Sequence, residues 1–154
     1  MRGLAKKAAD AVGTGLFAAL FLTFLIQITA RFVFNRPLPW TDELAVILYI
    51  WTILWAAAFM VAEREHVVFD LLLNALGRTA RRRMLLAGNA LIGILAACAL
   101  PASWDYIRFM AREGTPVLNL PFMWVFLPFA LLLAALVARN SWRCYRLLRN
   151  DAGP

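Results

Sequence analysis

The residues best suited to chemistry or recognition gather in one stretch, RFVFNRPLPWTDE, which occupies positions 31–43 between two very apolar runs. Its arginines and acids can make charge-assisted hydrogen bonds, so one hypothesis is a charged rim used in assembly or docking. The alternative, with equal support, is a well-formed turn, because Pro37 and Pro39 disfavour helix and Thr41 can cap the helix that follows. The candidate rim consists of Arg31, Asn35, Arg36, Trp40, Asp42 and Glu43.

Catalytic and cofactor chemistry is poorly represented in the rest of the chain. The one histidine, His66, excludes paired-histidine haem ligation within a monomer. It suits an interfacial loop better than a catalytic site, which needs an orienting partner and a pocket. Cys98 and Cys144 lack metal-ligand spacing, and no Gly-rich phosphate loop or nucleophile elbow occurs. The sequence therefore predicts a protein that is not an enzyme and carries no metal or cofactor.

The composition places this chemistry in a membrane. Of the 154 residues, 63% are hydrophobic and only 16% are charged, whereas a soluble domain is about 45–50% apolar. The net charge of +7 comes from basic residues clustered at the ends of apolar runs rather than along one polar face. Membrane topology explains that clustering better than nucleic-acid binding does.

Four apolar runs are long enough to cross a bilayer, which takes about 20 residues in a helix. We expect an all-α integral membrane protein with a single four-helix domain, 1–154. Pro101 and Pro128 fall inside two of the runs, where they should kink the helix while neighbouring helices satisfy the freed carbonyls. The expected spans are 11–34, 41–62, 84–110 and 121–138.

The orientation follows from the lysines and arginines in the connections. Twelve of them lie in the N-terminal segment, the second connection and the tail, against four in the first and third connections. Positive charge prefers the cytoplasm, so both termini should be cytoplasmic and residues 31–43 should face outward. A cleaved signal peptide is the competing interpretation of residues 1–30, but the apolar run continues past Ala30, and Ile28 fits a cleavage site poorly.

The segment VVFDLLLNALG, residues 67–77, is too short to span a membrane. On a helix, Asp70 and Asn74 share one narrow polar face, and the remaining residues are apolar. Such a helix should lie at the cytoplasmic interface, exposed to lipid or covered by a partner helix, or else extend the loop against the chain's own helices. His66 and Asp70 are therefore the candidate residues of the cytoplasmic interface.

Small and hydrogen-bonding residues form a ridge on the first span. Gly15, Ala19, Thr23 and Gln27 are spaced by four, and Arg31 continues the row toward polar groups of a partner helix. Such a ridge lets another helix approach closely, either within this chain or from another. The middle of every expected span is free of Asp, Glu, Lys, Arg and His, so nothing marks a substrate path.

Other residues near the membrane have structural interpretations. Trp51 and Trp55 are one helical turn apart and should face lipid or a partner together. Core packing or lipid contact explains them better than a ligand cage made by two tryptophans. Asp105 should form a local salt-bridged helix end with Arg108 and Arg112, which follow on nearly the same face.

Three blocks of sequence resemble the small membrane subunit of tripartite ATP-independent periplasmic (TRAP) transporters over nearly the whole chain. They are RFVFNRPLPWTDELAVILYIW, EREHVVFDLL and TPVLNLPFMWVFLP, in that order. The first is the most specific. The chain departs from the family at Glu65, where glycine is frequent, and near Gly77, where a proline is missing before the basic run.

The resemblance implies a subunit of a bacterial inner-membrane uptake system. In this family a periplasmic solute-binding protein captures an organic acid and delivers it to the membrane subunits. The large multi-span subunit carries the substrate and sodium sites, and a sodium gradient typically drives the uptake. The small subunit braces the large one and helps to dock the binding protein. The expected partners are thus these two proteins and the lipid bilayer, and no nucleic acid.

Two other classes of membrane protein fit the sequence less well. A membrane anchor or electron-transfer subunit needs haem ligands or a reactive constellation, which the sequence lacks. A stand-alone four-helix exporter typically relies on a membrane-buried acid in its first span, and here there is none.

Overall fold

The computed structural model describes residues 2–60 and 77–149, and within them the regular structure is helical. Four helices of this part are long and apolar enough to cross a membrane, which confirms the expected fold class. The helix expected at 67–77, with His66 and Asp70, lies outside the described residues apart from Gly77. The elements are α1 (Arg2–Phe32), α2 (Pro39–Trp55), the π-helix η1 (Ala56–Met60), α4 (Arg78–Met110) and α5 (Phe122–Arg149).

The helices extend beyond the apolar runs at their basic ends. Helix α1 begins at Arg2 rather than near residue 11, α4 begins at Arg78, and α5 continues to Arg149. The sequence segments concerned are rich in Lys and Arg, which have good helix propensity. Apolarity therefore marks the part of each helix suited to hydrocarbon, and not the end of the helix itself.

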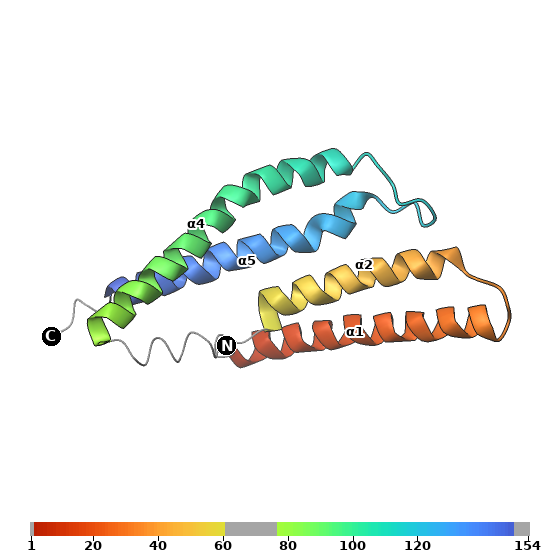
Figure 1. Cartoon of the computed structure of the whole chain (residues 1–154), viewed down its shortest axis with the longest axis horizontal. Coiled ribbons are helices and arrows are strands. Elements are labelled where there is room, and N and C mark those ends of the chain that lie inside the picture. The colour runs from red at the N-terminus through yellow and green to blue at the C-terminus, as the bar shows by residue number, and fades with distance from the viewer. Residues whose placement is uncertain (1, 61–76, 150–154) are drawn as a thin grey trace.

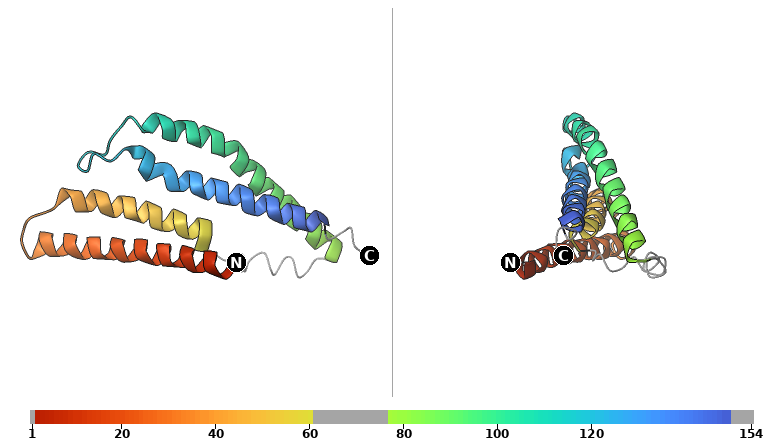
Figure 2. Two further views of the ribbon diagram at one scale, coloured as in Figure 1. Left: turned by 180° about the vertical axis from the view of Figure 1, so that it is seen from behind. Right: turned by 90° about the vertical axis from the view of Figure 1, so that its left-hand side faces the viewer.

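The helices lie side by side in the order α1, α2, α5, α4 (Figures 1 and 2). Helix α1 packs along α2, α4 packs along α5, and α2 joins the two pairs by contacting α5. Helices α1 and α4 are thus the outer members of a row. Large apolar side chains remain exposed on both, including Phe21 at 55% and Leu95 at 61%. Such a row has wide apolar faces that only lipid or another membrane helix can cover.

Helix α1 packs through residues spaced alternately by four and three, which is the spacing of nearly parallel helix packing. Gly13 lies against Met60 of η1, and an added Cβ there would overlap the Met60 sulfur. From the predicted ridge, Thr23 is buried and Ala19 and Gln27 are half-buried in this chain, while Gly15 has open space around it. The buried or half-buried residues at the alternating spacing are Ala9, Gly13, Leu16, Leu20, Thr23, Gln27 and Ala30.

Candidate partner-binding site at the 31–43 end

The turn between α1 and α2 is built by an asparagine and a proline. Asn35 adopts a left-handed backbone with φ of 51°, a conformation that Asn tolerates better than most residues. The N–H of Arg36 then donates to the carbonyl of Ala30 at 3.0 Å, which closes the end of α1. Leu38 is extended and Pro39 begins α2, where its missing N–H needs no helical partner. The chain thus reverses direction within residues 33–38.

The capping role expected for Thr41 is wrong. Helix α2 starts two residues earlier, at Pro39, and its N-cap residue Leu38 makes no side-chain capping bond. Thr41 is fully buried, and its hydroxyl donates to the Leu38 carbonyl at 2.6 Å. Because Pro39 can begin the helix without a side-chain cap, the Thr41 hydroxyl is not needed for capping and donates to the carbonyl three residues before it.

Asp42 links the two helices of the first pair. Its carboxylate accepts a hydrogen bond from the Gln27 side-chain amide of α1. The other amide atom, Gln27 Oε1, is buried and has no donor among the described residues. The predicted ridge residue Gln27 and the predicted rim residue Asp42 therefore meet within the chain.

Glu43 fastens α2 to the loop between α4 and α5. Its carboxylate accepts hydrogen bonds from the backbone N–H of Val117 at 2.8 Å and of Leu118 at 3.2 Å. The Thr115 side chain also bonds to this carboxylate. Successive N–H groups that converge on one anion form a binding nest, so Glu43 holds the α1–α2 turn and the α4–α5 loop at the same end of the molecule (Figure 1).

The loop that Glu43 binds has its own internal structure. Thr115 is 3% exposed; its N–H donates to the Leu120 carbonyl at 2.9 Å, and its Oγ1 accepts from the Leu120 N–H at 2.9 Å. Asn119 takes a left-handed φ of 51°, and Gly114 pairs with Pro121 in an isolated β-bridge. Sequence reasoning gave no role to Thr115. The available signal was a threonine before proline, followed by an asparagine that can occupy the left-handed position.

The two tryptophans of α2 bond to different helices, so the expectation that they face lipid or a partner together is wrong. The Trp51 indole N–H donates to the Trp124 carbonyl of α5 at 3.0 Å. The Trp55 indole N–H donates to the Ala9 carbonyl of α1 at 3.0 Å. Pro128 explains the first bond: it lies four residues after Trp124 and has no N–H, so the Trp124 carbonyl lacks its helical partner. Trp51 supplies the donor that an apolar bilayer cannot.

The remaining candidate residues of the rim are exposed. Among the described residues, the side chains of Arg31, Asn35, Arg36 and Trp40 make no hydrogen bond or ion pair. They are thus open to a partner, in contrast to Asp42 and Glu43. The salt-bridged end expected at Asp105 is wrong, because no ion pair joins it to Arg108 or Arg112 in the described part of the chain.

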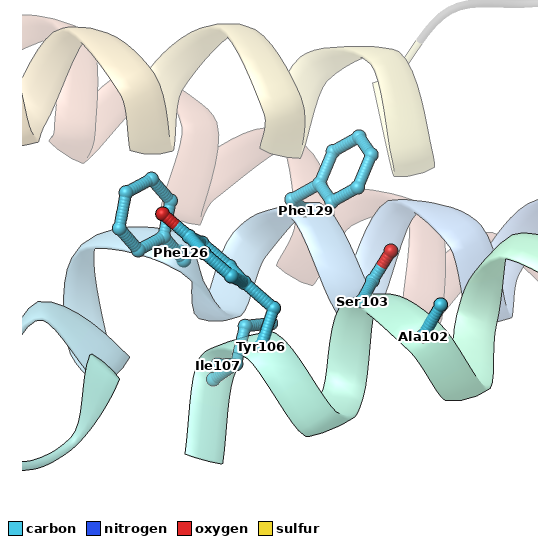
Figure 3. A pocket seen from close by; sticks show the side chains of 6 residues that line it. All are labelled: Ala102, Ser103, Tyr106, Ile107, Phe126 and Phe129. Carbon is cyan, nitrogen blue, oxygen red and sulfur yellow. The ribbon is translucent and has the colours of Figure 1, made fainter. Parts of the chain in front are cut away.

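The cavities near this end suit apolar contacts better than a reaction. One of about 390 Å³ lies between α4 and α5, where the rings of Tyr106 and Phe126 meet edge to face with centroids 5.7 Å apart (Figure 3). A second cavity of about 390 Å³ adjoins Asp42 and Glu43. Within residues 2–60 and 77–149, no three of His, Cys, Asp and Glu lie close enough together to hold a metal. The first cavity is lined by Ala102, Ser103, Tyr106, Ile107, Phe126 and Phe129.

Four helices that are long and apolar enough to span a bilayer define a multi-pass membrane protein. Residues 20–147 match the family described as tripartite ATP-independent periplasmic transporters, DctQ component. The chain therefore belongs to this family of small permease components, which are parts of a transporter and not enzymes. The resemblance inferred from the three sequence blocks is confirmed.

Curated relatives agree with this assignment. The chain is 34% identical over 77 residues to the sialic acid TRAP transporter permease protein SiaT of Haemophilus influenzae, a match of 50% of this chain and 12% of the relative. It is 33% identical over 116 residues to the C4-dicarboxylate TRAP transporter small permease protein DctQ of Rhodobacter capsulatus, covering 73% of this chain and 47% of the relative. The same-named protein of Vibrio cholerae is 29% identical over 89 residues, 58% of this chain and 38% of the relative. The chain thus spans less than half of each of these relatives.

Proposed function

We propose that this chain is the non-catalytic small membrane subunit of an ion-gradient-driven uptake system for an organic acid, located in a bacterial inner membrane. It braces a large multi-span subunit and helps to dock a periplasmic solute-binding protein. The observation that carries the proposal is the row of helices: α1 and α4 each pack against one neighbour and expose wide apolar faces. A partner helix can lie along such a face, whereas a row without a central lumen offers no path for a polar solute.

The substrate class rests on the relatives. Their names specify sialic acid and C4-dicarboxylates, which are organic acids. The described spans of this chain carry no Lys, Arg or His at mid-membrane depth that could bind such an anion. We therefore assign the acid-binding and ion-binding sites to the large subunit.

The docking surface that we propose is the end formed by the 33–38 turn and the 111–121 loop. With both termini in the cytoplasm, this end faces the periplasm, where a solute-binding protein would approach. The exposed side chains of Arg31, Arg36 and Trp40 supply positive charge and an amphipathic aromatic anchor. Glu43 has a supporting role, since it holds the 111–121 loop beside them.

Charge reversal at Arg36 tests the docking proposal. In the full three-protein system, Arg36→Glu should leave the amount of assembled membrane complex unchanged and slow uptake most at low salt, because an exposed charge chiefly affects encounter. Arg36→Lys keeps the charge and is the matched control. Uptake by Arg36→Glu equal to that of the parent at every salt concentration would remove Arg36 from the docking surface. Glu43 is unsuitable for this test because its replacement disturbs the loop itself.

A further inference from the structure

A groove follows the α4–α5 interface from near the middle of these helices toward the end opposite the 31–43 stretch. Its volume is about 280 Å³, and it extends along α4 from Asn89 to Ala97, about 12 Å at the usual rise per residue. An added Cβ on Gly93 would be 3.4 Å from the Asn140 Cβ, so the two helices approach closely beneath the groove. The lining residues are mostly small or apolar: Asn89, Ala90, Gly93, Ile94, Ala97, Val137, Asn140, Ser141 and Cys144.

The aromatic residues of α5 locate the groove relative to the membrane surface. Trp142 and Tyr145 are 55% and 53% exposed, and amphipathic rings of this kind sit at the headgroup level. They flank Cys144, which lines one end of the groove. The other end, at Ala97 and Val137, is about one and a half to two helical turns further along and thus lies in hydrocarbon.

Arginines border the headgroup end of the groove. Arg83 is exposed and lies two helical turns before Ala90, and so on the groove face of α4. Arg82 of α4 donates to the Leu147 carbonyl of α5, and Arg143 of α5 donates to the Asn89 side-chain oxygen of α4 at 3.3 Å. These bonds hold two guanidinium groups across the helix pair at the end of the groove.

The local field favours an anion at this position. The sequence of α4 from residue 78 to 104, and all of α5, contain no Asp or Glu. The N-terminus of α4 and the C-terminus of α5 lie together at this end, so their helix dipoles oppose each other and the arginine side chains supply the positive charge. An apolar groove that opens at such a basic end is complementary to a molecule with a long apolar chain and an anionic head.

We propose that this groove binds an anionic phospholipid, with one acyl chain between α4 and α5 and the phosphate beside Arg82, Arg83 and Arg143. Guanidinium groups bind phosphate oxygens in a bidentate manner, and basic sites between membrane helices select anionic headgroups. A zwitterionic phospholipid brings the same chains, but its cationic group is repelled by the arginines. Inorganic phosphate lacks the chain that the groove accommodates.

Binding is measured by native mass spectrometry on the purified full-length chain in detergent micelles. The probes are phosphatidylglycerol, phosphatidylcholine with the same acyl chains, and inorganic phosphate. Phosphatidylglycerol should be retained about tenfold more strongly than phosphatidylcholine, as basic residues at a membrane surface favour anionic lipids. Equal retention of the two lipids overturns the proposal.

Two pairs of variants separate the headgroup site from the groove. Arg83→Gln should lower phosphatidylglycerol retention, whereas Arg81→Gln, on the opposite face of α4, should not. Ala97→Leu fills the groove and should lower phosphatidylglycerol retention as well. Gly88→Leu is the matched control, because Gly88 is exposed on the opposite face of α4 with open space around it.

Circular dichroism shows whether each variant keeps its helix content, and the arginine pair decides alone if Ala97→Leu does not fold. Retention that is equal for Arg83→Gln and Arg81→Gln overturns the headgroup assignment. Binding of inorganic phosphate with lipid retention unaffected by Ala97→Leu overturns the lipid proposal in favour of a free-anion site.

Discussion

The bond from Trp51 to the Trp124 carbonyl should matter only because of Pro128. In the parent chain, Trp51→Phe removes the donor and leaves the carbonyl without a partner, since residue 128 has no N–H. With Pro128→Ala, the restored N–H can donate to the same carbonyl within α5. The two substitutions therefore form a double-mutant cycle across the α2–α5 contact.

The magnitude follows from the cost of leaving the Trp124 carbonyl without a partner. Leaving such a group without a partner costs about 1–3 kcal/mol, although bonds between membrane helices average nearer 0.6 kcal/mol. We expect Trp51→Phe to cost about 1–2 kcal/mol in the parent and less than about 0.5 kcal/mol in the Pro128→Ala background. The loss of ring area and of the proline ring occurs in both arms of the cycle and cancels.

Unfolding is followed by circular dichroism in mixed micelles as the mole fraction of dodecyl sulfate rises. Trp55→Phe in the same two backgrounds is the matched control, because its acceptor, the Ala9 carbonyl, belongs to α1 and does not depend on residue 128. Its cost should be the same with and without Pro128. If Trp51→Phe also costs the same in both backgrounds, Trp51 does not compensate for the proline.

Three further predictions follow from individual contacts. Glu43→Gln should speed amide hydrogen exchange at the Val117 and Leu118 N–H groups, which Glu43 binds. Asp42→Asn, which alters the neighbouring acid, should leave their exchange unchanged. Equal exchange in the two variants would contradict the role of Glu43 in holding the loop. Gly13→Leu should destabilise the α1–α2 pair by about 1–3 kcal/mol through overpacking against Met60. Gly15→Leu should have no effect in the isolated chain, because nothing lies close to Gly15. Thermal melting in detergent distinguishes the two variants. Asn35→Cys in a background without Cys98 and Cys144 should react with a membrane-impermeant thiol reagent in intact cells; protection would reverse the assigned topology.

The fold could be predicted from apolar runs and prolines because each of these acts locally. A bilayer requires a helix of a certain length, and Pro128 requires that something outside α5 satisfy a carbonyl. The packing of α2 against α5 makes Trp51 the donor to that carbonyl. The local sequence does not specify this packing. The ridge predicted on α1 shows the same limit. A constant step of four from Gln27 and Thr23 leads to Gly15, whereas the alternating steps of four and three seen in the structure lead from the same two residues to Gly13.

The candidate site was predicted as a location but not as a set of contacts. The stretch 31–43 has an unusual concentration of charge, and its two arginines are exposed at one end of the molecule. Glu43 turned out to bind N–H groups 74 and 75 positions away. Such a pairing depends on the conformation of the 111–121 loop and on the α2–α5 contact, so no local pattern in the sequence could reveal it.

Uptake into proteoliposomes tests the central claim most directly. Vesicles contain either this chain alone, its large membrane partner alone, or both, with the solute-binding protein outside and a sodium gradient imposed. Accumulation of radiolabelled C4-dicarboxylates and sialic acid is then measured. The account predicts a one-to-one complex of the two membrane proteins, and accumulation of one of these acids only when both are present. Accumulation by this chain alone, or equal accumulation by the large protein without it, would contradict the account.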